Sequence, residues 1–596
     1  MAALYDNPAL VAPARTLCRE EADGSLVLSS PETLGAYDRC IGDWLERWAA
    51  ETPDTLAFAE RDAGGAWRRV RWGELRRHVG AIAQRLLDLQ LPRDRPVLVL
   101  SDNSIDHAML MLAALHVGLP FCPVSSAYCR LTSDHTKIRG IVQTLQPSLV
   151  YAANAQTYGA AISACAGDAV KVLSEGAEDV PGALHFGSFL DTAETPAVRA
   201  AFEALRSDDV AKLLLTSGST GQPKVVVNTH RMLCANQQAL AQTWRFLATH
   251  KPVLLDWLPW SHTFGGNHNL NLVLRHGGTL HIDEGRPAPG LIEKTVRNLR
   301  EVRPNLHFNV PRGLDMLLPF LEADPALARE VLSPLLLVFY AAAALPASTW
   351  QRLEALAASV RDEPLWLTTS WGSTETSPLV TSAHFRLDGA GCIGIPLPGL
   401  ELKLVRNGEK QEMRVRGVSV FAGYRNAPEL TAAAFDDEGF YRIGDAGYLV
   451  DPQDPARGVI FDGRVAEDFK LSSGTWVSVG PLRLQLVTAL SPYAADAVIA
   501  GHDRDEIGAL VFPTAAALAA GPAAVAQTVR EALAAFQRSG AGSSQMPRRI
   551  LWMTEPLDAD AGEITDKGYV NQRAVLTRRA DAVARLYAGD ADVIRT

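Results

Sequence analysis

The sequence lacks the features that mark secreted or zinc-binding proteins. Its seven cysteines stand at wide separations without a C-x-x-C pair, which argues against both a disulfide framework and a zinc site. No basic region followed by a sustained apolar stretch occurs between Met1 and Glu20, so we expect no secretory signal. These absences favour a cytoplasmic protein, because thiols stay reduced in that compartment.

The sequence also lacks a dense block of lysine and arginine. The formal net charge is -10 at pH 7, and we therefore expect no nucleic-acid partner. Short basic pairs such as Arg68-Arg69 are expected on solvated faces of helices or strands.

Long unbroken apolar runs are missing as well. Two uncharged stretches, 331–351 and 507–529, contain enough residues to span a bilayer. Pro334 and Pro346 interrupt the first stretch, and Gly521-Pro522 divides the second. We therefore expect no membrane insertion.

The residues that are abundant describe a globular α/β enzyme. Hydrophobic residues make up 47% of the 596 residues and charged residues 21%, which is ample material for a large core. Helical periodicity, as in "WGELRRHVGAIAQRLLDLQ", alternates with short apolar strands such as "RPVLVLS". This alternation predicts mostly parallel sheets with crossover helices.

The pattern of the chain changes twice toward its C-terminal end. After Ile395 short strands and frequent turns predict a small β-barrel or meander. After Phe461-Asp462-Gly463 a compact βα segment begins. We therefore expect a large multi-lobed N-terminal domain over 1–463 and a smaller, mobile α+β domain over 464–596.

The segment "TSGSTGQPK", Thr216–Lys224, follows a buried-strand pattern and is rich in glycine and hydroxyl groups. Successive N–H groups in such a loop can form an anion nest, and a lysine at its mouth adds a positive charge. The spacing fits neither the Walker pattern nor the dinucleotide-binding fingerprint. From these residues alone, phosphate binding and an ordinary turn remain equally open.

The same segment resembles the phosphate loop of the adenylate-forming (ANL) superfamily, which includes acyl-CoA synthetases, luciferases and adenylation domains of peptide synthetases. Four further segments resemble that superfamily's motifs and occur in its order. They are "SWGSTETSP" (Ser370–Pro378), "FYRIGDAGYL" (Phe440–Leu449), "FDGRVAEDFK" (Phe461–Lys470) and "GEITDKGYVNQR" (Gly562–Arg573). The resemblance covers nearly the whole chain and implies that a carboxylic acid is joined to coenzyme A through an acyl-AMP intermediate, with ATP and Mg²⁺.

The resemblance also implies roles for individual residues at the nucleotide. The loop residues Thr216, Ser217, Gly218, Ser219, Thr220, Gly221 and Lys224 would hold the departing pyrophosphate. Thr374, in the run Gly372-Ser373-Thr374, would bind the α-phosphate, and Glu375 would organise Mg²⁺. Asp445 would accept the ribose hydroxyls, and Arg464 would contact the ribose or phosphate. The alternatives are a capped helix start for "GSTET", a turn aspartate for Asp445 and a surface arginine for Arg464.

Several positions depart from the superfamily's pattern. Trp371 stands where the family often has a tyrosine that stacks on adenine, and an indole can stack as well. Ala341, Ala342 and Ala343 match a small-residue segment beside adenine, where the family more often has glycine. Lys567 is the candidate adenylation lysine, although a glycine follows it, and a surface lysine is the alternative.

The resemblance further implies a hinge and a side that faces coenzyme A. Glu467 is our choice for the hinge residue, with Asp468 as the alternative, because the family commonly has aspartate there. Lys470 and Gly474 would face coenzyme A. A hinge is expected because the two half-reactions need different C-terminal faces against one pocket.

The acid itself is selected elsewhere in the chain. His262, Phe339 and Tyr340 are candidates for the acyl pocket. His262 would either orient the carboxylate or only pack in the pocket wall, and we interpret His268 as an ordinary packed histidine. The segments "THRMLCANQ", "GRVAEDFKLSSGTWV" and "ITDKGYVNQRAVL" most resemble bacterial feruloyl-CoA synthases, which activate hydroxycinnamates. A ligase for another aryl or medium-chain acid is the first alternative, and an adenylation enzyme that loads a separate carrier protein is the second. We expect a monomer or homodimer.

Overall fold

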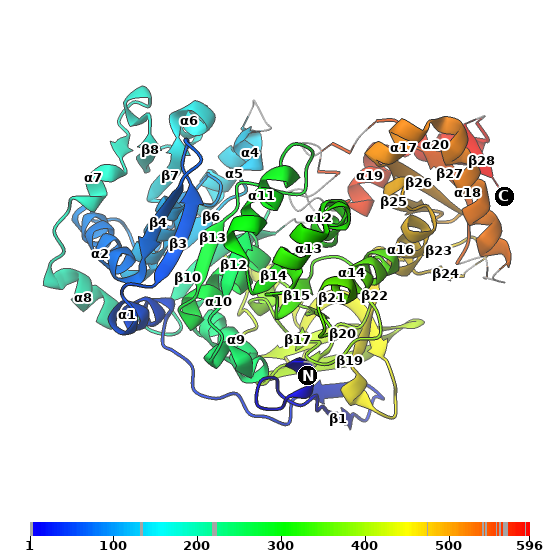
Figure 1. The fold of residues 1–596 in the computed structure, drawn as a ribbon, viewed down its shortest axis with the longest axis horizontal. Coiled ribbons are helices and arrows are strands. Elements are labelled where there is room, and N and C mark those ends of the chain that lie inside the picture. The colour runs from blue at the N-terminus through cyan, green and yellow to red at the C-terminus, as the bar shows by residue number, and fades with distance from the viewer. Residues whose placement is uncertain are drawn as a thin grey trace.

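The computed structural model contains several sheets with helices packed between and around them (Figure 1). It describes residues 4–130, 135–216, 223–473, 475–538, 542, 545–555, 557–558, 562–563, 570–590 and 592–595. The predicted α/β class with mostly parallel sheets is confirmed by the strand pairings. None of the helices formed by these residues is both long and apolar enough to cross a membrane.

The largest sheet has seven strands in the order β11-β10-β6-β5-β7-β8-β9. Its pairs are parallel except for β10 and β11, which form an antiparallel hairpin at one edge. The strands are β5 (Val97–Val99), β6 (Phe121–Pro123), β7 (Leu149–Asn154), β8 (Val170–Glu175), β9 (Leu184–His185), β10 (Val210–Thr216) and β11 (Lys224–Thr229). Helix α3 (Ile105–His116) supplies the crossover between β5 and β6, as the sequence pattern predicts.

Two further sheets extend the parallel architecture. One has the order β12-β13-β3-β4 and the other β14-β15-β16, and β12 lies next to β14. The strands are β3 (Leu56–Arg61), β4 (Trp67–Arg71), β12 (Val253–Asp256), β13 (Thr279–Ile282), β14 (Leu306–Asn309), β15 (Leu337–Tyr340) and β16 (Trp366–Thr369). The second of these sheets carries two of the predicted acyl-pocket residues, because Phe339 and Tyr340 lie on β15.

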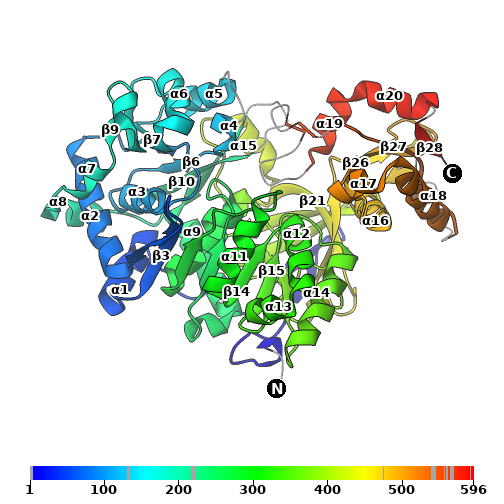
Figure 2. The ribbon, with the colours of Figure 1, turned by 45° about the horizontal axis from the view of Figure 1, so that its top comes forward.

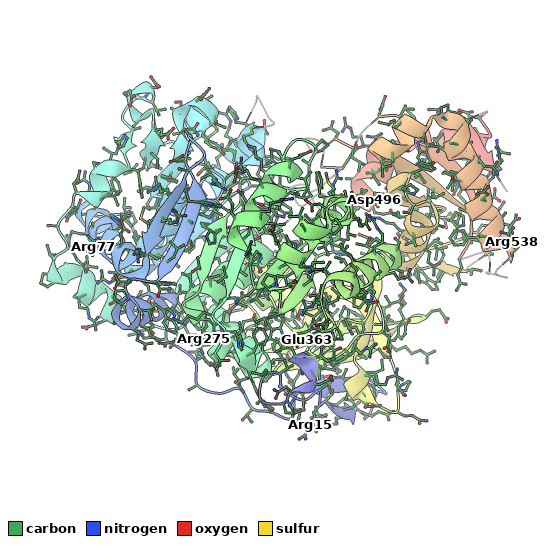
Figure 3. The ribbon with its side chains drawn as sticks, in the orientation of Figure 1. Arg15, Arg77, Arg275, Glu363, Asp496 and Arg538 are labelled. Atoms are coloured by element: carbon green, nitrogen blue, oxygen red, sulfur yellow. The ribbon has the colours of Figure 1, made fainter. Side chains whose placement is uncertain are left out.

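The helices cover these sheets as the apolar periodicity predicts. Helix α2 runs over Trp72–Asp88 and buries one face against α1 and α3. The principal helices of this part are α1 (Ile41–Glu51), α5 (Thr136–Leu145), α6 (Ala155–Cys165), α8 (Pro196–Glu203), α9 (His230–Thr243), α10 (Leu270–His276), α11 (Ile292–Val302), α12 (Pro311–Ala323), α13 (Pro325–Leu332) and α14 (Ala347–Val360). Their side chains fill the spaces between the layers (Figure 3).

The antiparallel part is an open meander rather than a barrel. Its six-stranded sheet has the order β1-β2-β19-β20-β21-β22, and among the described residues no pairing joins β1 to β22. The strands are β1 (Leu17–Glu20), β2 (Leu26–Ser29), β19 (Leu400–Asn407), β20 (Lys410–Gly417), β21 (Tyr441–Leu449) and β22 (Val459–Arg464). Of the two expected forms the meander is therefore the observed one, because the N-terminal hairpin extends the edge of β19 instead of letting the sheet close on itself.

The C-terminal part contains its own sheet and its own hydrophobic clusters. The sheet has the order β25-β26-β27-β28, and apolar side chains such as Leu486, Ile499 and Val529 pack on it. Its elements are α16 (Val479–Ala489), β25 (Ala494–Ala500), β26 (Ile507–Pro513), α17 (Ala515–Ala520), α18 (Pro522–Arg538), β27 (Pro547–Trp552), α19 (Gln572–Arg578), α20 (Ala580–Ala588) and β28 (Val593–Arg595).

Both ribbon views place this C-terminal part at the opposite end of the molecule from the seven-stranded sheet (Figures 1 and 2). It meets the rest of the chain where α16 packs against β22. The boundary at residue 463 stays a prediction.

Candidate functional site

The predicted phosphate loop connects the two strands of an antiparallel hairpin. Thr216, the last residue of β10, pairs with Lys224, the first residue of β11. Ser217, Gly218, Ser219, Thr220 and Gly221 lie outside the described residues. The hairpin therefore brings both ends of the loop together at one sheet edge.

Lys224 and Glu375 are linked through Tyr424, a residue that the sequence reasoning missed. The Lys224 ammonium lies 5.1 Å from the centre of the Tyr424 ring. The Tyr424 hydroxyl donates a hydrogen bond of 3.0 Å to Oε1 of Glu375. Burial, and then the nearby Glu375 charge, raise the pKa of Tyr424, so the phenol stays protonated and acts as a donor at neutral pH.

No local signal identified Tyr424 in advance. It sits in the irregular segment "FAGYRN" between β20 and β21, and it reaches β11 through a single antiparallel bridge with Val226. Such a long-range bridge leaves no periodic pattern in the sequence.

The turn that carries Thr374 and Glu375 is fixed from two sides. A short 3₁₀ helix, η5 (Thr374–Thr376), forms here, and Asn228 of β11 donates from Nδ2 to the Thr374 carbonyl at 3.0 Å. The amide of Phe421 donates to the Glu375 carbonyl at 2.8 Å. These bonds hold Thr374 and Glu375 against the strand that begins with Lys224.

Gly372 allows this turn to pack closely. A Cβ at that position would lie 1.8 Å from the carbonyl oxygen of Pro378, far inside van der Waals contact. Only glycine therefore fits between the strand β16 and the returning segment.

Asp445 lies between Trp371 and Arg464. The indole N–H of Trp371 donates to Oδ2 of Asp445 at 2.8 Å, and Nε of Arg464 lies 3.5 Å from Oδ1. Asp445 and Arg464 are register partners on β21 and β22. Burial raises the pKa of Asp445, while the Arg464 charge and the Trp371 hydrogen bond act to lower it.

Three buried polar atoms near this carboxylate have no hydrogen-bond partner among the described residues. They are Oγ of Ser370, Oγ of Ser373 and Oδ1 of Asp445, whose contact with Arg464 at 3.5 Å is an ion pair and not a hydrogen bond. Buried polar groups are normally paired, so a cluster of unpaired oxygens around Trp371 is typical of a site that a polar ligand completes.

The small-residue segment follows β15 directly. Ala342 and Ala343 are exposed and Ala341 is half-buried. Ala342 has a φ of 75°, a left-handed conformation that glycine adopts more readily than alanine. At Ala342 the backbone therefore has a conformation that favours glycine, although the residue is alanine.

The predicted acyl-pocket residues lie beside a tightly packed aromatic group. Phe339 and Tyr340 are both buried on β15. His262 precedes the π-helix η4 (Phe264–Asn269), whose Gly266 amide donates to the His262 carbonyl at 2.7 Å. The ring of Phe264, two residues after His262, lies 5.6 Å from that of Phe339.

The two hinge candidates have different surroundings. Asp468 is almost fully buried: it forms an ion pair with Lys410 of β20, and its Oδ1 accepts from the Val479 amide at 2.9 Å. Glu467 is half-buried and its backbone amide bonds to the Arg464 carbonyl at 3.1 Å. Asp468 is thus the one of the two that bridges to the antiparallel sheet.

Lys470, Gly474 and Lys567 belong to the C-terminal part. Lys470 is exposed, and its ammonium lies 4.9 Å from the centre of the Trp476 ring. Gly474 and Lys567 lie outside the described residues.

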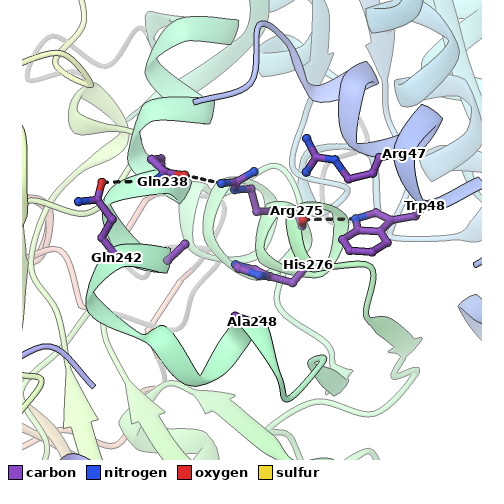
Figure 4. Close-up of a pocket in the computed structure, with 8 residues that line it drawn as sticks. Arg47, Trp48, Gln238, Gln242, Ala248, Arg275 and His276 are labelled. Carbon is purple, nitrogen blue, oxygen red and sulfur yellow. Dashed lines mark hydrogen bonds between the residues drawn. The ribbon is translucent and has the colours of Figure 1, made fainter. Parts of the chain in front are cut away.

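A separate surface cavity of about 320 Å³ lies between α1, α9 and α10 (Figure 4). Arg47 and Arg275 line it, and both form ion pairs with Asp38. Trp48 donates from its indole to the Arg275 carbonyl at 3.3 Å. None of the predicted site residues lines this cavity.

Comparisons with known proteins match both ends of the chain to one family. The AMP-binding enzyme model matches residues 45–425. A model for the C-terminal domain of AMP-binding enzymes matches residues 469–591.

Individual relatives are distant but cover most of the chain. A long-chain fatty-acid CoA ligase, FadD15 of Mycobacterium bovis, is 24% identical over 94% of this chain and 98% of its own length. A CoA ligase of Rhodococcus jostii for a methyl-dioxo-octahydroindenyl propanoate is 25% identical over 78% and 86%. A carboxylic acid reductase of Mycobacterium tuberculosis is 26% identical over 84% of this chain but 44% of its own length.

A solved structure supports the same fold. The anthranilate CoA ligase AuaEII, in complex with anthranoyl-AMP, superposes with a TM-score of 0.72 at 18% identity, over 93% of this chain and 99% of that one. This likeness concerns the fold alone. Because the family model spans well over half of its residues, the chain belongs to the AMP-binding enzyme family.

Proposed function

We propose that this enzyme, an AMP-forming acid–CoA ligase, acts on ferulate or a related hydroxycinnamate. The observation that carries the proposal is the aromatic group of Phe264 and Phe339, because Phe339 lies on β15 and β15 pairs with β16, the strand that leads to the turn of Thr374 and Glu375. Aromatic walls of this kind suit a planar aryl acid.

The first half-reaction must bring two anions together. A carboxylate oxygen of the acid attacks the α-phosphorus of ATP, and pyrophosphate leaves with the bonding electrons. The chain has to offset the negative charge that gathers there. We assign this role to Lys224 and the Thr216–Gly221 loop at the departing pyrophosphate, to Thr374 at the α-phosphate, and to Lys567 at the carboxylate.

The carboxylate of Glu375 fits a magnesium ion. It is buried, and its Oε1 accepts a hydrogen bond from the uncharged Tyr424 hydroxyl. No cluster of three or more His, Cys, Asp or Glu side chains able to hold a metal occurs among the described residues, so further ligands would come from water and phosphate, as Mg²⁺ prefers. When bound, the ion would neutralise charge on the phosphates.

We assign the nucleoside to the region around Trp371, where buried oxygens make no hydrogen bond to the described residues. Asp445, steadied by the Trp371 N–H, would accept hydrogen bonds from the ribose hydroxyls, and Arg464 would lie at the ribose or phosphate. Ala341–Ala343 would lie along adenine, with Ser373 and Gly372 on the facing turn. Because Trp371 already donates to Asp445, we propose that its indole both positions this carboxylate and borders the base.

The second half-reaction replaces AMP by a thioester. The sulfur of coenzyme A attacks the acyl carbon, and AMP leaves as the carbon–oxygen bond breaks. Lys470 and Gly474 are assigned to the coenzyme A side, and the segment Glu467-Asp468 to the change of orientation between a domain of 1–463 and one of 464–596. His262 and Tyr340 are assigned to the wall around the acid.

Similarity to a carboxylic acid reductase keeps a second candidate function in view. An enzyme that loads a separate carrier would form the same acyl-AMP but pass the acyl group to a carrier thiol. A ligase for another aryl or medium-chain acid would differ only in the pocket.

A panel of acids tests the proposal. Ferulate, 4-coumarate, caffeate, benzoate, octanoate and palmitate would each be supplied with ATP and Mg²⁺, with and without coenzyme A, and AMP release measured. We expect the hydroxycinnamates to give the highest kcat/KM, with release that depends on coenzyme A.

The outcomes separate the candidates. A fatty acid that outranks ferulate in kcat/KM would refute the hydroxycinnamate assignment. Acyl-AMP that forms on the enzyme but never transfers to coenzyme A would favour the carrier-loading function instead.

A further inference from the structure

His268 is a buried histidine in the middle of an aromatic enclosure. It lies on the π-helix η4 and has no exposed surface. Its ring stacks on Phe339, with centres 4.9 Å apart, and it meets Phe308 at 5.2 Å and Phe264 at 5.8 Å. Burial lowers the pKa of His268 to about 4, so the imidazole is neutral at physiological pH.

Its neighbours decide which ring nitrogen carries the hydrogen. Nδ2 of Asn269 donates to Oδ2 of Asp256 at 2.9 Å, which turns the Asn269 oxygen toward His268. That oxygen lies 2.8 Å from Nδ1 of His268. Because an amide oxygen can only accept, Nδ1 must be the protonated nitrogen, and Nε2 is left with an unshared lone pair.

Nε2 of His268 has no hydrogen-bond partner among the described residues, and the atom is buried. An unpaired buried acceptor is unfavourable. The Trp244 ring also lies 6.3 Å from that of His268, but its indole N–H forms no hydrogen bond to any described residue. The group that would satisfy Nε2 is therefore a hydroxyl carried by an apolar molecule. A neutral imidazole cannot donate from Nε2, which excludes a carboxylate as its partner.

The strand β15 connects the enclosure to the proposed nucleotide site along the chain. Phe339 and Tyr340 are neighbours on β15, and the chain runs from them directly into Ala341–Ala343. β15 also pairs with β16, which leads into Trp371 and the turn of Thr374 and Glu375. An aryl acid activated at that turn would extend its ring toward Phe339 and His268.

We propose that Nε2 of His268 accepts a hydrogen bond from the ring hydroxyl of the aryl acid, so that His268 selects hydroxylated over unhydroxylated cinnamates. This inference rests on the proposed function of the same site. His268 is a specificity-determining residue and takes no part in the bond-making steps.

The wild-type enzyme provides the first test. The kcat/KM values for 4-coumarate, cinnamate and 4-fluorocinnamate would be compared, because the last two lack the hydroxyl donor at similar size. We expect 4-coumarate to exceed both by about tenfold to a hundredfold, the range for a buried hydrogen bond left unmade. Equal values for all three acids would overturn the inference without any substitution.

The His268→Phe variant provides the second test. We expect it to lose about tenfold to a hundredfold in kcat/KM for 4-coumarate while its value for cinnamate stays within about threefold of wild type. His268→Gln keeps an acceptor and should retain part of the preference. An equal loss for both acids would overturn the inference.

His307→Phe is the matched control. His307 is also buried and its pKa is also lowered to about 4 by burial. It neighbours Phe308 on β14, so its side chain points to the opposite face of the strand. We expect this variant to change kcat/KM for 4-coumarate and for cinnamate by the same factor.

The two proposals fail in different ways. If the wild-type enzyme uses 4-coumarate and cinnamate with equal kcat/KM, the proposed role of His268 is refuted but the hydroxycinnamate function is not. Wild-type enzyme that uses neither acid, but releases AMP with a fatty acid, removes the proposed function.

Discussion

Asp445 and Trp371 come from segments more than seventy residues apart, yet they form a single hydrogen-bonded unit. Asp445 is buried, and burial raises its pKa while Arg464 and Trp371 act to lower it. A raised pKa means that the carboxylate is lost at a higher pH than for an exposed aspartate. As the pH falls, ribose binding should therefore weaken at a higher pH than the ordinary pKa of an aspartate would give.

Replacing the Trp371 indole tests whether this bond positions the carboxylate. Trp371→Phe removes the N–H donor and leaves an aromatic ring, and we expect the KM for ATP to rise about tenfold, the effect of one hydrogen bond to a charged group. The measurement is ATP–pyrophosphate exchange at saturating acid.

Trp67→Phe is the control, because Trp67 makes a comparable indole bond of 2.9 Å to Glu301 away from the site. An unchanged KM for ATP in Trp371→Phe would show that the indole N–H is not required to position the Asp445 carboxylate.

At the level of elements, the turn after β16 depends on close backbone packing. A Cβ at Gly372 would lie 1.8 Å from the Pro378 carbonyl oxygen, and the contact is with backbone that cannot rotate away. Gly372→Ala must therefore displace the turn that carries Thr374 and Glu375.

We expect Gly372→Ala to reduce ATP–pyrophosphate exchange by at least about a hundredfold, since a shift of 1 Å at a reacting site has effects of that size. Gly389→Ala is the control, because a Cβ there would meet nothing within 4 Å. A Gly372→Ala enzyme with normal exchange and a normal Tm would contradict the role of this turn.

Most elements could be predicted from local patterns, and their connections could not. The periodicity of "WGELRRHVGAIAQRLLDLQ" predicts a helix, and α2 forms there. The apolar run before Thr216 predicts a strand, and β10 ends at that residue. The pairing of β2 with β19 joins residues nearly four hundred positions apart, and no local period encodes such a pairing. The sequence therefore left a barrel and a meander open, and the structure has the meander.

The candidate site shows the same division. Ordered motifs mark Trp371, Asp445 and Glu375 as candidates, and their roles stay predictions. No motif marks Tyr424 or His268. They become candidates only in the structure, through the hydrogen bond of Tyr424 to Glu375 and the unsatisfied Nε2 of His268. Sequence patterns carry information about the chain's own neighbours, whereas burial and hydrogen-bond satisfaction depend on distant ones.

At the scale of the whole molecule, an ion pair between described residues joins the antiparallel sheet to the C-terminal part. Lys410 of β20 pairs with Asp468, which also accepts the first amide of α16. Burial raises the pKa of Asp468, and the Lys410 bond acts to lower it. Without Lys410 the carboxylate would be buried and uncompensated, which is strongly unfavourable. This pair should therefore stabilise the observed orientation of the C-terminal part.

If the two half-reactions use two orientations, Lys410→Met should affect them unequally. We expect one half-reaction to slow by about tenfold or more relative to the other, since each tenfold step needs about 1.4 kcal/mol. ATP–pyrophosphate exchange reports the first step, and thioester formation from preformed acyl-AMP reports the second. Asp468→Asn should shift the same half-reaction, with little added effect in the double variant.

Two comparison variants make this result interpretable. Arg416→Met breaks an ion pair with Glu401 inside the antiparallel sheet and should change neither half-reaction. Lys567→Ala should abolish acyl-AMP formation and spare thioester formation. Equal effects of Lys410→Met on both steps would contradict a role in orientation.

The N-terminal hairpin of β1 and β2 has a practical consequence. The family model begins at residue 45, so a shortened protein designed from it would lose β2, the strand that covers the edge of β19. The bared edge would present a row of unpaired amides and carbonyls on apolar residues such as Leu402 and Leu404. Exposed edges of this kind pair with other chains, so residues 17–29 protect the protein from self-association and belong in any version made for study.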